Sequence, residues 1–351
     1  MDSFLSGPGR VSGARRATNK ARFLLFLGLS ICLRPLELVA AQEIPGPSTL
    51  PLTQGEFTAE LNGLTLWFKV SGVGPVCLMP NPAWGPSSDL YFRTLKPLEK
   101  SFTMVYLDCR GTGRSQRAAS TKEYTWDHLV TDLDALRSHL QQEKVWLMGH
   151  SEGGMQILHY ACRYPARVRG LVLLDAAAVT DEEANRDITS RMQRRQGAPW
   201  FPEAVKAQQG LQSETVKSDA DIKAAIMALL PFYWSDPARI AAHASDFEAT
   251  SMSAVAWRGQ TDSHRFSFDL RDPLKHLRAP VLIVVGDDDF ICSPLAAKRL
   301  HLCLPNSKLL LIEGAGHFPW LEQPDVFFHD VPVFLRALPS ADPPRREEAK
   351  L

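Results

Sequence analysis

The segment that decides the fold is "KVWLMGHSEGGMQILHYACRY", residues 144–164. It begins with a short apolar run typical of a buried strand and continues with apolar residues at helical spacing. Between the two parts, Gly149, Ser151 and Gly153 fit the pattern Gly-x-Ser-x-Gly. A strand-to-helix turn this tight strains its central residue and holds the Ser151 hydroxyl clear of the sheet edge. The segment therefore indicates either a nucleophilic serine or an incidental Gly-Ser turn.

Apolar runs of the same kind lie on both sides of this segment. They cover residues 75–79, 102–108, 171–175, 281–286 and 308–314. Continuous Val, Leu and Ile runs are typical of parallel strands that are buried on both faces. Upstream, residues 56–70 alternate apolar and polar positions around Asn62-Gly63, which predicts a hairpin with a type I′ turn. The predicted fold class is α/β, with a mostly parallel central sheet and an N-terminal hairpin.

Helical segments are predicted between the strands, and most of them lie in one long insertion. Residues 178–268 separate two core strands and contain no convincing strand of their own. Four helical stretches are predicted there, over residues 180–196, 202–212, 218–230 and 236–249. A long insertion between core strands is either a lid over the active site or an ornament, and here it is interpreted as a helical cap.

Composition and charge narrow the class of partner. The 351 residues are 45% hydrophobic and 22% charged, and Lys plus Arg balance Asp plus Glu at 39 each. Because no overall field would recruit nucleic acid, a small-molecule or short-peptide substrate is expected instead.

Neither a cofactor nor a metal is expected. Residues 111–116, "GTGRSQ", are half of a dinucleotide fingerprint, with Gln116 where the third glycine belongs. The aspartates at 287–289 lack the glycine and terminal glutamate of a calcium loop, and no zinc-type spacing of cysteines and histidines occurs. The cysteines after residue 41 are odd in number and scattered over predicted core elements, as buried thiols are.

A serine nucleophile needs a base whose own orientation is fixed by a carboxylate. The strand at 281–286 is followed by three aspartates, 287–289, and the last strand is followed by His317 in a glycine-rich turn. The order serine, aspartate, histidine is the one that this architecture imposes. Ser151 is therefore the predicted nucleophile and His317 the predicted general base, and the amide of Glu152 at the new helix start is a predicted oxyanion donor.

The chain from about residue 56 to 338 resembles the α/β hydrolases, and among them most resembles the prolyl iminopeptidase group. The resemblance is carried by "YLDCRGTGRS" (106–115), "YTWDHLVTDLDALR" (124–137), "GHSEGG" (149–154), "GDDDF" (286–290) and "GAGHFPWLEQP" (314–324). It implies an α/β-hydrolase fold and a serine hydrolase activity. In the family pattern the acid lies three positions after the strand-ending glycine, which implies Asp289, with Asp175 as the alternative.

One departure from the family pattern bears on the oxyanion hole. Relatives usually carry His-Gly-Gly-Pro-Gly after the third strand, where this chain has "NPAWG", residues 81–85. Pro82 has no N–H group to donate. The first oxyanion donor is therefore expected to be Ala83, with Trp84 possible, and Glu152 is expected to supply the second.

A second departure bears on the substrate. Ala241 stands where the peptidases have a glutamate that helps to hold the free amino terminus of the substrate, which weakens the aminopeptidase interpretation. Other acids of the insertion are candidates to replace that glutamate: Glu203, Glu214, Asp236, Asp246 and Glu248. The predicted function is a serine hydrolase that cleaves ester or amide bonds of a small substrate. The alternatives are a prolyl-type aminopeptidase and a non-catalytic binding protein of the same fold.

The two ends of the chain differ from the rest. Basic residues precede an uncharged apolar run, "FLLFLGLSICL" at 23–33, and small residues then offer cleavage after Ala41. This pattern predicts a signal for secretion or periplasmic export, with a membrane anchor at 23–33 as the alternative. The predicted division is a signal peptide or anchor (1–41), a first part of the core (42–177), a helical cap (178–268), a second part of the core (269–338) and a disordered tail (339–351).

Overall fold

The computed structural model describes residues 52–212, 217–263, 265 and 267–337. The predicted leader with its cleavage at Ala41, the anchor alternative at 23–33, the tail at 339–351 and Glu214 lie outside the described residues, and remain predictions. Within the described ranges, no helix has the length and apolar character needed to cross a membrane.

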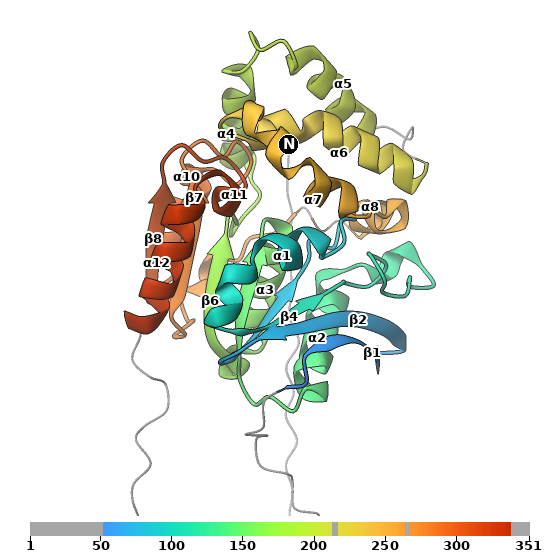
Figure 1. Ribbon diagram of the computed structural model, residues 1–351, viewed down its shortest axis with the longest axis vertical. Helices are drawn as coiled ribbons and strands as arrows, with labels where there is room; N and C mark the ends of the chain where they lie inside the picture. Colours follow the sequence, from blue (N-terminus) through green and yellow to red (C-terminus); the bar gives the residue numbers. More distant parts are fainter. Residues whose placement is uncertain (1–51, 213–216, 264, 266, 338–351) are drawn as a thin grey trace, which may run out of the picture. The chain divides into compact units, whose positions relative to one another are not determined.

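An eight-stranded sheet forms the centre of the fold (Figure 1). Its strands are β1 (Gly55–Leu61), β2 (Leu64–Gly72), β3 (Val76–Pro80), β4 (Thr103–Leu107), β5 (Val145–His150), β6 (Val168–Leu174), β7 (Val281–Gly286) and β8 (Ser307–Ile312). Their spatial order is β1-β2-β4-β3-β5-β6-β7-β8. β2 is antiparallel to both of its neighbours, and all the other neighbouring pairs are parallel. The predicted α/β class with a mostly parallel sheet is confirmed.

The predicted N-terminal hairpin is formed by β1 and β2. Leu61 pairs with Leu64, which leaves a two-residue loop of Asn62 and Gly63. Both loop residues have positive φ, 51° and 80°, as a type I′ turn requires. Glycine adopts this conformation without strain, and asparagine tolerates it better than most side chains.

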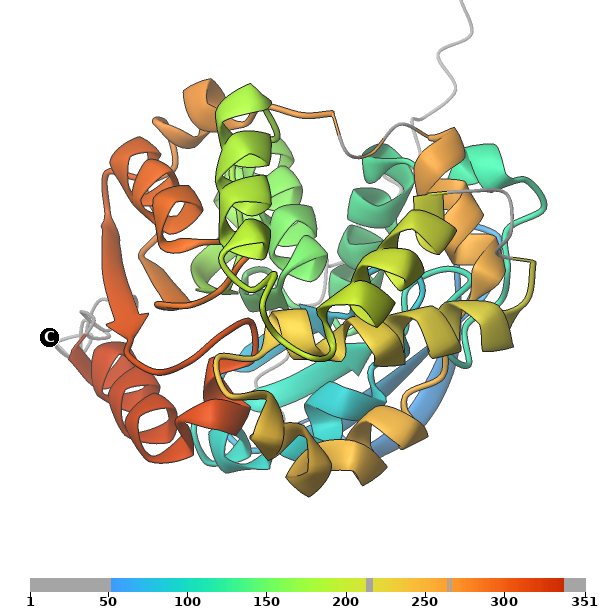
Figure 2. The same ribbon diagram turned by 90° about the horizontal axis from the view of Figure 1, so that it is seen from above.

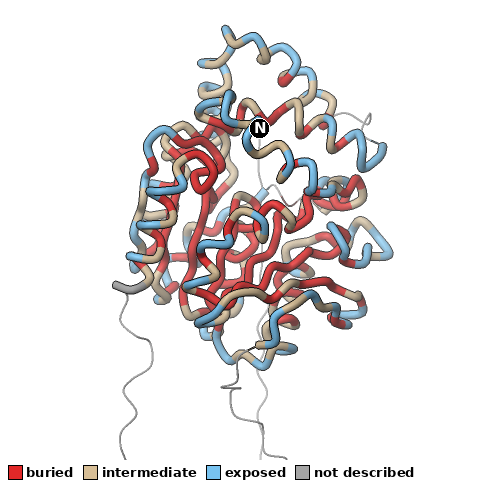
Figure 3. The backbone as a smooth tube through the Cα atoms, in the orientation of Figure 1, coloured by how far each residue is buried: buried red, intermediate tan, exposed pale blue. Residues whose placement is uncertain are grey.

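Helices cover both faces of the sheet, so that two hydrophobic cores form (Figure 2). One core involves α2 (Trp126–His139), α3 (Glu152–Arg163) and α10 (Pro294–Cys303), and the other involves α1 (Asp89–Thr94), α11 (Pro319–Glu322) and α12 (Pro324–Ala337). Successive strand residues alternate between the cores: Leu147 belongs to the first, while Trp146 and Met148 belong to the second. The central strands β3 to β7 are therefore almost entirely buried, whereas the edge strands β1 and β8 are partly exposed (Figure 3).

The residues between β6 and β7 form a series of helices beyond the carboxyl ends of the strands (Figure 1). They are α4 (Glu182–Gln193), α5 (Phe201–Gln212), α6 (Asp219–Tyr233), η4 (Pro237–His243), α7 (Ala244–Ala249) and α8 (Ala254–Asp262). The last helix before β7, α9 (Arg271–Leu274), instead packs in the sheet core beside α3 and α10. The single helix expected over 236–249 is a 3₁₀ helix followed by a short α-helix. α8 was not predicted, because it is short and its apolar pattern is weak. Three further 3₁₀ helices are η1 (Lys96–Lys100), η2 (Thr121–Glu123) and η3 (Pro165–Arg167).

Candidate active site

Ser151 occupies a strained turn between β5 and α3. Its φ of 54° and ψ of −124° lie outside the regions that residues with a side chain ordinarily adopt. The neighbouring glycines allow the turn to be this tight. A Cβ on Gly149 would lie 2.4 Å from the Gly153 carbonyl oxygen, and a Cβ on Gly153 would lie 2.9 Å from the Pro80 carbonyl oxygen. The Gly-x-Ser-x-Gly pattern therefore corresponds to a structural need for glycine on both sides of Ser151.

The turn faces a cavity of about 210 Å³ between the carboxyl ends of the strands and the helices that follow β6. Ser151, Glu152 and His317 all line this cavity. Most of the other lining side chains are apolar or aromatic, among them Trp84, Leu90, Met155, Ile226, Leu230, Phe247, Met252, Trp257, Ile291 and Phe318. An apolar cavity with few polar groups is the usual form of a small-molecule site.

His317 is held in the cavity wall by Asp289. Its Nδ1 lies 2.8 Å from Asp289 Oδ2, and both residues are buried, at 2% and 0% exposed. The second carboxylate oxygen of Asp289 accepts hydrogen bonds from the backbone N–H groups of Ile291 (2.9 Å) and Cys292 (3.3 Å). The carboxylate therefore orients the ring and leaves Nε2 as its other polar atom.

The two aspartates before Asp289 are engaged elsewhere. Asp287 accepts a hydrogen bond from the N–H of Gly314, and Asp288 forms an ion pair with Arg195 at 2.6 Å. Of the three successive aspartates, Asp289 is the one that contacts His317.

Asp175, the alternative acid, lies beside Asp289 at the end of β6. Burial and the neighbouring Asp289 charge raise the pKa of Asp175 well above its usual value. Two adjacent buried carboxyls share one negative charge more readily than they hold two. Burial and the neighbouring carboxyl therefore favour the neutral form of Asp175. Asp175 Oδ1 accepts a hydrogen bond from Gly286 N–H at 3.0 Å.

Cys292 is a third polar group beside Ser151 and His317, and it was not singled out from the sequence. Its Sγ lies within 4.8 Å of a carboxylate oxygen of Asp289 and of a ring nitrogen of His317. Burial, followed by the charge of Asp289, raises the pKa of the Cys292 thiol well above its usual value, although a hydrogen bond with Ser151 opposes that shift. The Cys292 thiol therefore lies beside the Ser151 hydroxyl, and among the described residues no hydrogen bond joins that hydroxyl to His317.

His150, immediately before Ser151, supports the backbone at His317. Its Nε2 lies 2.7 Å from the His317 carbonyl oxygen, and its Nδ1 lies 3.0 Å from the Tyr91 hydroxyl. Since a carbonyl oxygen only accepts, Nε2 carries the proton and Nδ1 accepts from Tyr91. Burial and the adjacent His317 hold the pKa of His150 well below its usual value, so the ring is neutral.

The Glu152 side chain occupies the predicted oxyanion region. Its Oε2 accepts a hydrogen bond from Trp84 N–H at 3.1 Å, so this N–H, the alternative donor in the sequence prediction, is already paired. Burial raises the pKa of the Glu152 carboxyl, and the charge of Arg265, followed by the N–H groups of Ala83 and Trp84, opposes that rise. The backbone N–H of Glu152 lies at the first position of α3, where an amide has no partner within the helix. The assignments of the Glu152 and Ala83 N–H groups as oxyanion donors both remain predictions.

Arg265 is the buried counter-ion of Glu152. Its Nη2 lies 3.2 Å from Glu152 Oε1, and the residue is 1% exposed. Its own carbonyl oxygen accepts a hydrogen bond from Trp126 Nε1 at 2.9 Å. Arg265 carries no sequence signal, because it stands alone after α8, more than a hundred positions from Glu152.

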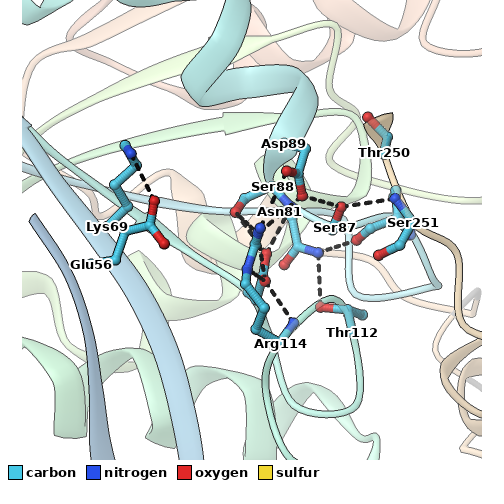
Figure 4. A network of polar contacts seen from close by, with 12 residues as sticks. Glu56, Lys69, Asn81, Ser87, Ser88, Asp89, Thr112, Arg114, Thr250 and Ser251 are labelled. Carbon is cyan, nitrogen blue, oxygen red and sulfur yellow. Dashed lines mark hydrogen bonds and ion pairs between the residues drawn. The ribbon is translucent and has the colours of Figure 1, made fainter. Parts of the chain in front are cut away.

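The loop that carries Ala83 and Trp84 is fixed by a polar network (Figure 4). Asn81 Nδ2 donates to Thr112 Oγ1 at 2.9 Å. The Ser87 N–H donates to the Ser251 carbonyl oxygen at 2.9 Å, and the Ser251 N–H donates to Ser87 Oγ at 3.1 Å. The loop after β3 is thus attached to the loop after β4 and to the segment between α7 and α8.

Known proteins share this sequence pattern and this architecture. The sequence model of the α/β-hydrolase-fold family matches residues 78–324. The proline iminopeptidase PfmaB of Pestalotiopsis fici is 26% identical over 279 residues, 76% of this chain and 94% of that protein. A proline iminopeptidase of Lactobacillus delbrueckii subsp. bulgaricus is 31% identical over 248 residues, 68% of this chain and 83% of that protein.

Solved structures agree on the fold. An α/β-fold family hydrolase from Bacillus anthracis str. Sterne has a TM-score of 0.67 at 19% identity, covering 79% of this chain and 98% of its own. An esterase from Rhodococcus sp. ECU1013 has a TM-score of 0.63 at 21% identity, covering 82% and 100%. With a family match over more than half of its length and the sheet described above, this chain belongs to the α/β-hydrolase family.

Proposed function

We propose that the protein is a serine hydrolase that transfers the acyl group of an uncharged ester to Ser151. One observation carries this proposal: a strained serine opens into the same cavity as a buried histidine whose Nδ1 is held by Asp289. A serine hydroxyl is a weak nucleophile unless a positioned base removes its proton, and His317 Nε2 is the base within the same cavity.

The proposed reaction has two steps. Rotation of the Ser151 hydroxyl from Cys292 toward His317 lets Nε2 take the proton as Oγ bonds to the substrate carbonyl carbon. The Glu152 N–H stabilises the resulting oxyanion, and His317 returns the proton to the departing alcohol as the carbon–oxygen bond breaks. A water then attacks the acyl-enzyme by the same route, which releases the acid and restores Ser151.

The cavity lining supports an uncharged acyl substrate. Glu152 is the one carboxylate among the described lining residues, and it is already paired with Arg265. The described cap acids from the sequence prediction are Glu203, Asp236, Asp246 and Glu248, and none of them lines the cavity. Asp246 forms an ion pair with Arg93 at 2.8 Å. A substrate ammonium would therefore enter an apolar cavity without a free counter-ion, at a cost of several kcal/mol.

The second candidate is a prolyl-type aminopeptidase, and relatives named proline iminopeptidase favour it. Ala241, which stands where those peptidases have a glutamate, lies exposed on η4 and does not line the cavity. The acyl ester hydrolase is therefore the first choice.

A substrate screen against a Ser151→Ala blank tests the proposal. We expect p-nitrophenyl butyrate to be cleaved, and Ser151→Ala to lower turnover by on the order of 10⁴ to 10⁶, because triad members act as a unit. We also expect acetylation of the amine of a prolyl anilide to change kcat/KM by less than about tenfold. A loss of about a hundredfold or more on acetylation would put the aminopeptidase first. Ester cleavage at the native rate by Ser151→Ala would refute the nucleophile.

A further inference from the structure

A second cavity lies next to the one that Ser151 faces. Its volume is about 180 Å³, close to the 210 Å³ of the first. The side chains that line the second cavity alone come from α4, α5, α6 and the segment after β7: Ile188, Met192, Gln208, Leu229, Phe232 and Phe290. This cavity lies among the helices that follow β6 and is separate from the sheet core, since its lining belongs to a hydrophobic cluster of its own.

Four side chains line both cavities. They are Leu211, Tyr233, Trp257 and Ile291. Each comes from a different segment of the chain, from α5, α6, α8 and the turn after β7. Because the cavities share these walls, side chains separate them. Rotamer changes, which take picoseconds to nanoseconds where side chains are free to move, are enough to join two spaces divided in this way.

The lining of the second cavity selects an apolar occupant. Gln208 is its one amide, and the Gln208 Nε2 contacts Met192 Sδ at 3.8 Å. No charged side chain is among its described lining residues. Phe290 packs against Phe232 at 5.4 Å between ring centroids, so the base of the cavity is aromatic. A charged or strongly hydrated group has no partner there, whereas a hydrocarbon chain loses nothing on leaving water.

We propose that the two cavities form one binding site for a linear fatty acyl chain. This inference rests on the proposed function, in which the acyl carbonyl lies at Ser151. Short acyl groups occupy the first cavity alone. Longer chains pass between the four shared side chains and end beside Met192 and Phe290. The narrow passage between the shared side chains favours a linear acyl group over a branched one.

A series of p-nitrophenyl esters from acetate through butyrate and octanoate to dodecanoate tests the site. We expect kcat/KM to rise by up to about fourfold for each added methylene that becomes buried. Met192→Trp fills the second cavity from α4. In this variant we expect hydrolysis of butyrate to be unchanged within about twofold, and that of dodecanoate to fall at least about tenfold, since several buried methylenes are lost. Thr189→Trp, on the exposed side of the same helix, is the matched control and should change neither ester.

Two results separate this inference from the proposed function. If butyrate is cleaved but longer esters are no better, or if Met192→Trp slows both esters equally, the extended site is wrong and the hydrolase stands. If no ester is cleaved, the hydrolase proposal fails, and dodecanoic acid binding by Ser151→Ala with and without Met192→Trp still decides the cavity. Weaker binding with Met192→Trp supports the inference, and equal binding overturns it. Should Met192→Trp not fold, Ile188→Phe fills the same cavity from the preceding turn.

Discussion

Asp175 and Asp289 are both buried beside the site, and of the two it is Asp289 that contacts His317. We expect Asp289→Asn to lower kcat/KM by about 10⁴, because an amide in this place holds the imidazole in the wrong tautomer, as in the serine proteases. Asp175→Asn should change kcat/KM by less than about tenfold, because the raised pKa of Asp175 favours a neutral carboxyl, which the neutral amide replaces. Steady-state kinetics of both variants with the butyrate ester measure the difference. A large loss in Asp175→Asn alone would move the acid to Asp175.

The Glu152 carboxylate lies beside the place where the oxyanion of the proposed reaction would form. Like charges held close together in a buried site repel each other strongly. Arg265, 3.2 Å from Glu152 Oε1, offsets the Glu152 charge, which the proposed use of the Glu152 N–H as an oxyanion donor requires. We therefore expect the ion pair between Arg265 and Glu152 to affect both the stability of the fold and the rate of the proposed reaction.

At the scale of elements, this ion pair links the segment after α8 to the start of α3. We expect Arg265→Met to lower the free energy of unfolding by about 3 kcal/mol, because removal of one partner leaves a buried charge uncompensated. kcat should fall as well, since the unpaired carboxylate then faces the oxyanion. Adding Glu152→Gln removes that charge, so the double variant should recover part of both losses. Denaturant unfolding and ester kinetics of the two single variants and the double variant measure the coupling.

Arg265→Lys is the control for this cycle, because it keeps the charge and loses the guanidinium geometry. It should lie between the native protein and Arg265→Met in both measurements. Strictly additive losses in the double variant would show that Arg265 acts through packing alone, for instance through its contacts with Trp126.

At the scale of the whole molecule, the sheet and the positions of the chemical groups were largely predictable from the sequence. Strands buried on both faces leave continuous apolar runs, and strand ends bring together groups that are distant in the chain. Ser151, His317 and the three aspartates 287–289 were singled out in this way, and the family resemblance then implied Asp289, which contacts His317. Residues of this kind can be recognised in the sequence because each lies in a glycine-rich turn or a short loop directly after a strand.

The remaining features depend on tertiary contacts that leave no local pattern. α8 is short, and its position follows from packing. Arg265 and Cys292 gain their importance from partners more than a hundred positions away, Glu152 and Ser151 respectively. The occupation of the Trp84 N–H by a side chain, likewise, follows from the arrangement of two loops in space.

Glu322 ties the His317 turn to the helices above the sheet. Its Oε1 accepts a hydrogen bond from Gly316 N–H at 2.7 Å, and its Oε2 accepts from Ser235 N–H at 2.8 Å and from Asp236 N–H at 3.4 Å. Burial raises the pKa of Glu322 from 4.5 to about 7, although these N–H groups oppose the shift. The folded protein therefore keeps a proton that the unfolded chain releases between these two pH values.

This retained proton makes stability depend on pH in a definite direction. Where the folded state binds more protons than the unfolded state, the free energy of unfolding falls as pH rises, here across pH 4.5 to 7. We expect Glu322→Gln to lack this contribution. As pH rises from 4.5 to 7, the free energy of unfolding of the variant should therefore increase relative to that of the native protein by up to roughly 3 kcal/mol, at about 1.4 kcal/mol for each pKa unit. Denaturant unfolding of both proteins at several pH values measures the difference, in which the contributions of the other titrating groups cancel. Parallel profiles would mean that the Glu322 carboxyl is already ionised at the acid end of this range, with its three N–H donors outweighing its burial.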